Sequence, residues 1–359
     1  MTRVILSRPS TSLGAGSNGE GPGADRGIVR RPLATLGEAQ DDTSLPLTIA
    51  IVTWNSERWI ARCLGSIDAA CAGIGHEIIV YDNASTDGTL RLVGDDATLL
   101  RGASNAGFAA GINRAVKNAR GRYVFLLNPD CELAPGALAS LVDYLDEHAD
   151  VAAAAPLLSD DDGGSQREFQ LRRLPTFGTL LADVLGVSKL WPSNRVTSRY
   201  RYRDLDLSVP RPVEQPAAAA LLLRRNVFEQ VGAFDERFTP AWFEDVDYCR
   251  RLAAAGKRID VVPAARARHF GGASLEHVGF AEFVDHWYRN MHLYARKWLP
   301  ARQAALLRWA VVLGMLLRIP LAFLGIAHRD AGRANAVRGY ARVLGRALRK
   351  WNAPVSPRA

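Results

Sequence analysis

The stretch Val124-Phe-Leu-Leu-Asn-Pro-Asp130 joins a short apolar run to a carboxylate. An apolar run of this length, bounded by turn residues, is typical of a buried strand in a parallel sheet. Ligands of open α/β sheets bind outside the carboxyl ends of such strands, so Asp130 is expected at the rim of a site. A second acidic cluster, Glu244-Asp-Val-Asp247, follows more than a hundred residues later. The two clusters together indicate a polar site between them.

Strand-like and helix-like segments alternate on both sides of this stretch, which predicts parallel βαβ units and an α/β sandwich. Strands are expected at 47–54, 76–82, 98–102, 123–127 and 151–158, and helices at 57–70, 86–93, 106–119 and 135–147. Residues 160–210 are polar, rich in arginine and weakly periodic. They are expected to form a long loop, and a long loop in a compact domain is often functional.

Charge is distributed unevenly along the 359 residues, of which 48% are hydrophobic, enough for a sizeable core. From Arg289 onward there are 14 Lys/Arg against one acidic residue, Asp330, and the rest of the chain has 31 basic and 36 acidic residues. A mildly acidic body with a basic end argues against nucleic acid as a partner. It favours a domain with one end facing a membrane.

The N-terminal segment and the cysteines both favour a cytosolic protein. Residues 1–44 carry Gly, Ser and Pro clusters without an apolar run long enough for a signal peptide, and are expected to be a disordered tail. The four cysteines lack the paired spacing of a zinc site and are too few for a disulfide scaffold, which indicates a reducing compartment.

The C-terminal segment has two features that suit a membrane surface. Apolar stretches at 309–317 and 319–327 are separated by Arg318. A spanning helix needs about 20 apolar residues, and a central arginine costs roughly 2.5 to 3.5 kcal/mol, so partial or interfacial insertion is expected. Residues 329–351 then predict a basic amphipathic helix on an anionic leaflet. The alternative is a helix packed on the body with a solvated basic face.

The segment Val80-Tyr-Asp-Asn-Ala-Ser-Thr-Asp-Gly-Thr89 repeats the pattern of an apolar strand that ends on a carboxylate. Helix capping alone would explain its Ser, Thr and second Asp, whereas Asp82 needs another explanation. The turn after the first strand has neither a G-x-G-x-x-G nor a G-K-[ST] motif, which excludes two common nucleotide folds. Gly107 and Gly111 are equally well explained by tight helix packing.

Five motifs, taken together and in this order, resemble glycosyltransferase family 2, over about residues 47–270. They are Thr53-x-Asn55, Asp82-Asn-x-Ser-x-Asp-Gly88, Asn105-x-Gly-Phe-x-x-Gly-x-Asn113, Asn128-Pro-Asp130 and Glu244-Asp-x-Asp247. Many relatives have Asp-x-Asp at the position where this chain has Asn-Pro-Asp. In this motif the chain resembles the rhamnosyltransferase-like branch of the family. The resemblance implies the GT-A fold, a Rossmann-like mixed sheet sandwiched by helices, at 45–300, followed by a helical membrane-associating extension at 301–359.

The resemblance also assigns a donor site to the matching positions. Carboxylate and amide groups at strand ends can bind a nucleobase edge and ribose hydroxyls. The implied donor-binding residues are Thr53, Asn55, Glu57, Asp82, Asn83, Asn105, Gly107, Asn113 and Asn128.

A metal site is implied beside the donor diphosphate. Asp130 would bind Mg²⁺ or Mn²⁺, which is typically held by one or two carboxylates and by phosphate oxygens. Asn128 removes one anionic ligand, so affinity for the metal without donor is expected to be low. His269 would complete the site, although a lone histidine is usually structural. The alternative for Asp130 is a cap of the helix that begins near Pro135.

The resemblance makes Asp245 the general base that deprotonates the acceptor, with Trp242 and Glu244 on the acceptor side. The alternative is that the acidic cluster only places negative charge at the N-terminus of a helix over 246–255. Glu244 and Asp247 are expected to do no more than that.

The function implied is an inverting hexosyltransferase that moves L-rhamnose from dTDP-rhamnose to a polyprenyl-diphosphate-linked saccharide, in cell-wall or surface-polysaccharide synthesis. Its expected location is cytoplasmic, peripheral on the inner face of the cell membrane, against an anionic surface. Two alternatives remain open: a sugar nucleotidyltransferase, and a non-enzymatic sugar-nucleotide-binding membrane scaffold.

Overall fold

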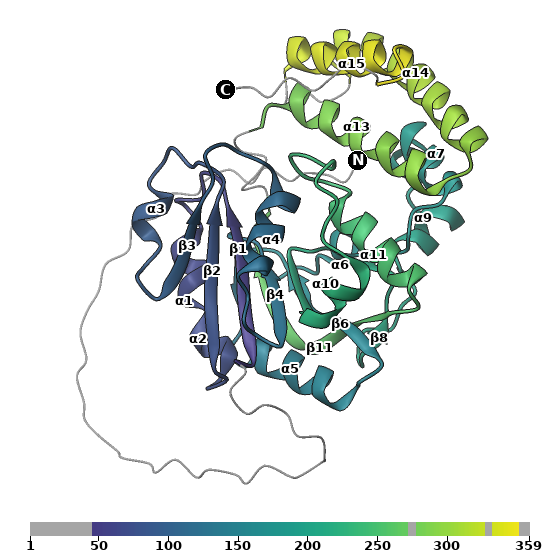
Figure 1. The fold of residues 1–359 in the computed structure, drawn as a ribbon. Coiled ribbons are helices and arrows are strands. Elements are labelled where there is room, and N and C mark those ends of the chain that lie inside the picture. The colour runs from purple at the N-terminus through teal and green to yellow at the C-terminus, as the bar shows by residue number, and fades with distance from the viewer. Residues whose placement is uncertain (1–44, 272–277, 327–331, 352–359) are drawn as a thin grey trace, which may run out of the picture.

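The computed structural model describes residues 45–271, 278–326 and 332–351. The expected tail at 1–44 lies outside these residues. The described chain forms one large sheet with helices on both faces, and a group of C-terminal helices at one end (Figure 1).

The sheet is mixed, as expected, with the order β3-β2-β1-β4-β10-β6-β11-β5 and with β8 paired to β11. The strands are β1 Leu47–Thr53, β2 His76–Asp82, β3 Ala97–Arg101, β4 Tyr123–Leu127, β5 Cys131–Leu133, β6 Val151–Ser159, β8 Arg211–Pro212, β10 Ala220–Arg224 and β11 Arg258–His269. Strands β1 to β4 are parallel, whereas β10 runs antiparallel to both β4 and β6. A separate pair joins β7 Leu171–Arg172 to β9 Gln215–Pro216.

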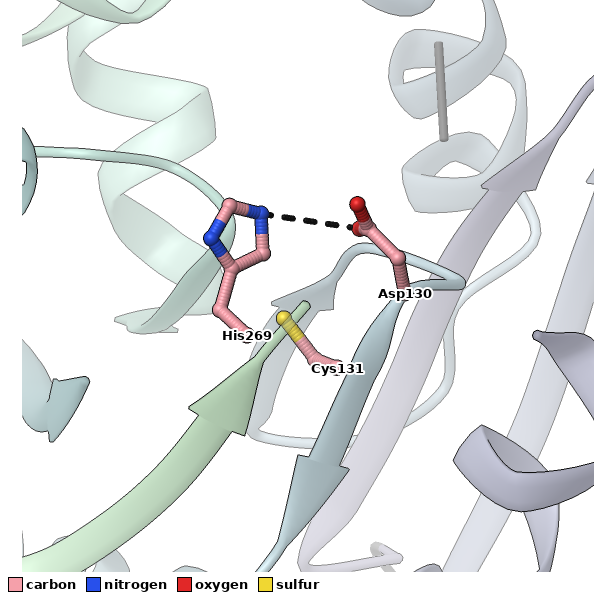
Figure 2. A group of neighbouring side chains, drawn as sticks. All are labelled: Asp130, Cys131 and His269. Atoms are coloured by element: carbon pink, nitrogen blue, oxygen red, sulfur yellow. Dashed lines mark ion pairs between the residues drawn. The ribbon is translucent and has the colours of Figure 1, made fainter. Parts of the chain in front are cut away.

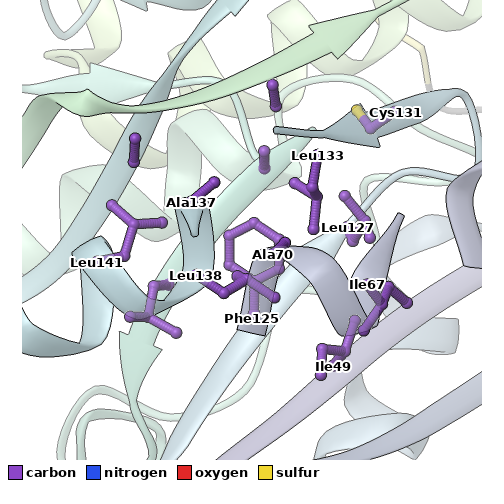
Figure 3. Packing of buried hydrophobic residues seen from close by; sticks show 14 of the residues in the cluster. Ile49, Ile67, Ala70, Phe125, Leu127, Cys131, Leu133, Ala137, Leu138 and Leu141 are labelled. Atoms are coloured by element: carbon purple, nitrogen blue, oxygen red, sulfur yellow. The ribbon is translucent and has the colours of Figure 1, made fainter. Parts of the chain in front are cut away.

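Alternating apolar residues in the central strands build two cores, because successive side chains of a strand point to opposite faces. Ile49 and Ile51 of β1 pack with Phe125 on one face, under helices α1, α2 and α5 (Figure 3). Val52 and its neighbours pack on the other face, under α4 and α11. The helices are α1 Ile60–Gly65, α2 Ile67–Cys71, α3 Thr89–Leu92, α4 Phe108–Lys117, α5 Ala137–Glu147, α10 Arg225–Val231 and α11 Glu244–Ala254.

The expected helix at 57–70 is two helices that meet at Ser66. The Ser66 hydroxyl donates to the Cys63 carbonyl at 2.8 Å and accepts from the Leu133 amide at 3.0 Å. A serine that bonds its own backbone competes with the helix ladder, which accounts for the break. The expected helix at 86–93 is reduced to the short α3, because the residues before it are bound to the loop after β1.

The prediction of a loop over 160–210 was wrong. This segment contains α6 Arg167–Gln170, β7, α7 Phe177–Val184, α8 Val187–Leu190 and α9 Arg195–Tyr200. Thr176 and Thr179 form a capping box at the start of α7, and the Asn194 side chain caps α9 by accepting from the Thr197 amide at 2.9 Å. The helices are too short to show apolar periodicity, and the caps were the signal available in the sequence.

The C-terminal helices α13 Phe280–Trp298, α14 Ala301–Phe323 and α15 Arg333–Leu348 share a third core with α7 and with Phe243. Only Leu299 and Pro300 separate α13 from α14, so the division expected at residue 300 falls inside a packed helix group. By length and composition alone, α14 could cross a membrane.

Helix α15 packs on the other C-terminal helices through one face, whereas its contact with a leaflet stays a prediction. Ala336, Tyr340 and Val343 are buried against the other helices. Arg346 of α15 forms an ion pair with the buried Asp285 of α13 at 3.1 Å. The packing of this face agrees with the alternative of a helix packed on the body.

Gly111 provides a test of how closely α4 packs on the sheet. A β-carbon at this position would lie 2.7 Å from Cγ1 of Val52. We expect Gly111→Val to lower the free energy of unfolding by about 1 to 3 kcal/mol, since a filled core strains when atoms are added. Urea unfolding measures this change. Gly65→Ala, where a β-carbon meets open space, is the control and is expected to be neutral or slightly stabilising; equal stability of both variants would contradict the prediction.

Candidate active site

The register of the sheet gathers the predicted polar residues at one edge. Thr53 at the end of β1 lies opposite Asp82 at the end of β2, and Ile51 lies opposite Leu127, the last residue of β4. The loops after these three parallel strands therefore leave from the same edge. Strand β10 is antiparallel, with Ala220 opposite Leu127, so the chain enters β10 at that edge too.

Asp82 is buried and organises the loop that follows it. Its Oδ1 accepts from the Thr53 hydroxyl at 3.0 Å and from the Ser85 hydroxyl, and its Oδ2 accepts from the Ser85 amide at 3.0 Å. The carboxylate is thus held in one orientation at the strand end. Contact between Asp82 and a nucleobase stays a prediction.

Asn55 and Glu57 tie the loop after β1 to the loop after β2. Oδ1 of Asn55 accepts from the Thr86 amide at 2.8 Å, and Oε2 of Glu57 accepts from the Gly88 amide at 2.9 Å. Asn55 adopts a left-handed backbone conformation, with φ of 50°. The two loops form one connected wall above the strands.

Asn83, Asn105 and Gly107 bring the third loop to the same wall. The Asn83 amide group donates to the Gly107 carbonyl at 3.3 Å and accepts from the Ala106 amide at 3.1 Å, while Oδ1 of Asn105 accepts from the Gly107 amide at 3.0 Å. Gly107 has φ of +91°, and a β-carbon there would lie 2.6 Å from the Pro240 carbonyl oxygen. Both facts require glycine.

Gly111 and Asn113 have structural contacts. Gly111 lies tightly against Val52, which is the packing explanation offered for it above. The Asn113 side chain accepts from the Phe234 amide at 2.8 Å and donates to the Phe234 carbonyl at 2.9 Å. Asn113 therefore fastens α4 to the loop that precedes the second acidic cluster.

Asp130 and His269 meet as expected, although 139 positions separate them in the sequence. Nε2 of His269 lies 3.6 Å from Oδ1 of Asp130, and both side chains are buried (Figure 2). The Asp130 carbonyl accepts from the Phe270 amide at 2.9 Å, which fixes the two segments relative to each other. Ligand atoms of Asp130, Cys131 and His269 all lie within 4.8 Å of one another.

Gln166 determines which nitrogen of His269 carries the proton. Nε2 of Gln166 donates to the backbone carbonyl of His269 at 2.7 Å, so Oε1 of Gln166 must be the atom 2.9 Å from Nδ1 of His269. An amide oxygen only accepts, and Nδ1 is therefore the protonated nitrogen. In the neutral imidazole the lone pair of Nε2 then faces Asp130. Phe169 stacks on the ring with centroids 5.0 Å apart and holds its plane.

Asp130 and His269 fit a divalent cation. Two ligands bonded to one ion at about 2.1 Å lie roughly 3 to 4 Å apart, which matches the separation of the carboxylate oxygen from Nε2. A nitrogen lone pair and a carboxylate that face each other repel, and a cation bound between them would stabilise this arrangement. Cys131 fits less well: burial raises the pKa of its thiol well above the usual range, and its Sγ donates to the Ala219 carbonyl at 3.4 Å.

Asp245 lies at the same edge of the sheet, next to the chain that enters β10. Oδ2 of Asp245 accepts from the Gln215 side chain at 3.3 Å and weakly from the Ala218 amide at 3.5 Å. The next carbonyl, that of Ala219, accepts from the Asn128 amide at 2.8 Å. One short segment thus lies between Asp245 and the Asn-Pro-Asp turn. Burial raises the pKa of Asp245, which suits a group that takes up a proton.

The other acidic residues of the cluster differ in their surroundings. Asp247 is fully buried, forms ion pairs with Arg251 and Lys297, and accepts a hydrogen bond from the Trp298 indole at 2.7 Å, so its contacts are structural. Glu244 is buried, and among the described residues its Oε2 has no hydrogen-bond partner. Burial, and then the charge of Asp245, raise the pKa of Glu244 well above its usual range.

Trp242 is partly buried and packs edge-on against Phe283 of α13, with centroids 4.9 Å apart. It therefore borders the third core on the side of Asp245. An acceptor contact for Trp242 stays a prediction.

Sequence reasoning missed Gln166, Gln215 and Arg172. The last two are opposite each other in the β7–β9 pair, and the charge of Arg172 lowers the pKa of Asp245, against the larger effect of burial. None of the three belongs to a motif or follows a recognisable apolar strand, so the sequence offered no signal for them.

Known proteins resemble this chain in sequence and in fold. Residues 48–230 match the model of Glycosyl transferase family 2. The chain is 29% identical over 288 residues to the N-acetylglucosaminyl-diphospho-decaprenol L-rhamnosyltransferase of Mycobacterium tuberculosis, covering 76% of this chain and 91% of that protein. It is 28% identical over 149 residues to Rhamnosyltransferase WbbL of Escherichia coli, covering 41% of this chain and 52% of that protein. The solved mannosyltransferase PcManGT from Pyrobaculum calidifontis, in complex with GDP-Man and Mn²⁺, matches with a TM-score of 0.48 and 18% identity, over 86% of this chain and 89% of that one.

The mixed sheet and the family match define a nucleotide-sugar-dependent glycosyltransferase with the GT-A fold. The chain belongs to glycosyl transferase family 2, whose model matches just over half of its length. The expected similarity to the rhamnosyltransferase-like branch is confirmed by the two named relatives.

Glu244 gives the site a measurable pH dependence of stability. Because its pKa is raised in the folded protein, unfolding releases a proton above the ordinary pKa of 4.5. Stability is therefore lost as the pH rises from that value towards the folded-state pKa, by at most about 1.4 kcal/mol per pH unit. We expect Glu244→Gln to remove this slope, so that its gain over the wild type is larger at about pH 8 than at about pH 5 in thermal unfolding. The exposed Glu229→Gln is the control, and an identical gain at both pH values would contradict the assignment.

Proposed function

We propose that the protein transfers L-rhamnose from dTDP-rhamnose to an N-acetylglucosaminyl-diphosphate carried on a polyprenol, with inversion at the anomeric carbon. The observation that supports the proposal is that Asp245 accepts from the Ala218 amide, while the next carbonyl, that of Ala219, accepts from the amide of Asn128 in the turn that leads to Asp130 and its partner His269. The mycobacterial relative, with which the chain aligns over 91% of that protein's length, bears the name of such an activity and supports the choice of sugar and acceptor.

Asp245 acts as the general base. Its carboxylate takes the proton of the acceptor hydroxyl while that oxygen attacks the anomeric carbon from the face opposite the diphosphate. The bond from the anomeric carbon to the phosphate oxygen breaks, and the electron pair leaves with the nucleoside diphosphate. Positioned general-base catalysis contributes about a hundredfold to ten-thousandfold.

The wall formed by the three loops receives the nucleotide. Thr53, Asp82 and Asn83 line the strand ends, and Asn55 and Glu57 lie on the loop above them. Asn105 and Gly107 close the wall on the third loop. Carboxylate and amide groups in this arrangement can bind a base edge and ribose hydroxyls.

Asp130 and His269 would hold Mg²⁺ or Mn²⁺, with Asn128 beside them. A bound cation would offset the negative charge of the diphosphate. Gln166 orients His269, so that Nε2 is the nitrogen available to the metal.

The enzyme works on the cytoplasmic side of the cell membrane as a peripheral protein. A polyprenol-linked acceptor is held in the membrane, and the apolar helix α14 gives the protein a means of staying close to it.

Asp245→Asn tests the base. We expect kcat to fall by about a hundredfold to ten-thousandfold, since the amide cannot accept the proton, while the affinity for dTDP-rhamnose is unchanged. Transfer of labelled sugar from a panel of dTDP, UDP and GDP sugars to the lipid-linked acceptor measures the rate, with the exposed Asp143→Asn as the control.

Three outcomes of that assay would overturn the proposal. Release of pyrophosphate instead of a nucleoside diphosphate would identify a nucleotidyltransferase. Turnover with another sugar donor only would exclude rhamnose as the transferred sugar. Full turnover by Asp245→Asn would exclude Asp245 as the general base.

Gln166→Leu tests the metal site without relying on activity. We expect it to weaken Mn²⁺ binding in the presence of dTDP by about 10 to 100-fold, because a partner that orients a histidine ligand has been removed. Titration of free Mn²⁺ by electron paramagnetic resonance measures the affinity. Asp130→Asn should weaken it at least as much, and Glu132→Gln, a half-exposed neighbour, should not. Equal affinity in the wild type and Gln166→Leu would exclude this site.

A further inference from the structure

Exposed large apolar side chains are concentrated in two segments, 185–196 and 306–326, which we call the apolar end surface. Leu190 and Trp191 are 85% and 64% exposed, and Phe323 of α14 is 71% exposed. Leu313, Leu316 and Leu317 of α14 are each more than half exposed. A monomer in water rarely exposes so large an apolar area, and such a surface usually marks a binding site.

The two segments are neighbours in space. A β-carbon on Gly314 of α14 would lie 3.0 Å from the Val184 carbonyl at the end of α7, and one on Gly186 would lie 3.7 Å from the Arg318 guanidinium. Helix α8, which starts at Val187, therefore begins beside the middle of α14. Figure 1 shows α7 next to the C-terminal helix group.

The exposed face of α14 is distinct from the face that builds the core. Leu307, Val311 and Met315 are buried in the third core. The apolar residues on the other side of the helix pack on no described residue to a comparable extent. Helix α14 is thus apolar on both its inner and its outer face, as expected for a helix between a protein core and a second apolar phase.

The charges around this surface select its partner. Residues 184–203 and 289–326 contain no Asp or Glu. Lys189, Arg195 and Arg302 are exposed within or beside the apolar segments. An apolar surface whose own segments carry cations and no carboxylate matches an anionic lipid leaflet. It does not match a second copy of the chain, because a symmetric dimer through this surface would bring like charges together.

We propose that residues 185–196 and the outer face of α14 together dock on an anionic leaflet, with Leu190 and Trp191 as a second apolar anchor beside α14. The inference rests on the proposed membrane-borne acceptor and extends it by naming the surface that faces the lipid. Helix α15, whose Ala336, Tyr340 and Val343 are buried against the other helices, is not counted in this surface.

The docking segment also connects to the base. The chain leaves the site after Arg172, whose charge acts on Asp245, and returns at Tyr200, whose carbonyl accepts from the Arg173 amide at 2.8 Å. Residues 173–199 thus extend from the acceptor side of the site to the leaflet and back. A diphosphate carried on a polyprenol would emerge from the lipid next to this segment.

Sedimentation of the full chain with vesicles tests the proposal. Vesicles of phosphatidylglycerol and phosphatidylcholine in equal parts should bind the protein more tightly than phosphatidylcholine alone. Leu190→Ser combined with Trp191→Ser should weaken this binding on the order of tenfold or more, because two exposed apolar side chains are lost. Lys189→Ser or Arg195→Ser should weaken it about fivefold each on the anionic vesicles only.

Leu92→Ser is the matched control, since Leu92 is exposed but lies on α3, far along the chain from the apolar end surface. Circular dichroism melting checks that each variant folds. Unchanged vesicle binding by the Leu190→Ser, Trp191→Ser variant would overturn the proposal. So would a dimer in analytical ultracentrifugation that this variant abolishes, or wild-type protein that alkaline carbonate does not release from the vesicles.

A transfer assay separates this proposal from the proposed function. With a water-soluble, short-chain N-acetylglucosaminyl-diphosphate acceptor, the variant should match the wild type, whereas with the polyprenol-linked acceptor in vesicles it should be slower. Suppose that the wild type transfers sugar to neither acceptor, while the Leu190→Ser, Trp191→Ser variant loses vesicle binding as expected. This result would support the docking surface and reject the proposed function. Normal transfer in vesicles by a variant that binds them normally would reject the docking surface alone.

Discussion

The parallel pairing of β1 with β2 and β4 is the constraint on which the site depends. It places the ends of three strands side by side, about 4.8 Å apart from one strand to the next, and all their loops leave from one edge. The antiparallel entry of β10 then brings Ala218 and Ala219 to the same edge. If β10 did not run antiparallel to β4, the backbone that Asp245 binds would not lie next to the Asn-Pro-Asp turn. The candidate site residues come from distant parts of the sequence, but they share one rigid support.

The acidic groups at this edge are handled in different physical ways. Asp82 is fixed by neutral donors from Thr53 and Ser85, and Asp247 by cations and an indole. Asp245 accepts from the Val246 amide at 2.7 Å and from two longer donors, and burial works against its charge. Burial raises the pKa of Asp245, which suits a group that binds a proton, whereas the bonds of Asp82 and Asp247 hold the surrounding loops and helices in place.

The sequence predicted what depends on local pattern and missed what depends on tertiary contact. The apolar strand that ends at Asp82 and the one that Asp130 follows were recognised because each strand and its carboxylate are close in the sequence. The break at Ser66 was missed because its cause includes the distant Leu133 amide. Residues 160–210 were taken for a loop since their helices have no more than eight residues. Gln166 acts on a histidine 103 positions away, which no spacing reveals.

The Gly107 loop is bound to the C-terminal helices through one stretch of backbone. Pro240 accepts from the Phe108 amide at 2.7 Å, and the neighbouring Thr239 and Ala241 carbonyls accept from Arg289 and Asn290 of α13. In a shortened version of the protein that ended after β11, those carbonyls would lose their donors, and the Gly107 loop would be held less firmly. The region matched by the family model is therefore too small to serve as a minimal enzyme, and expression boundaries should be drawn beyond α13.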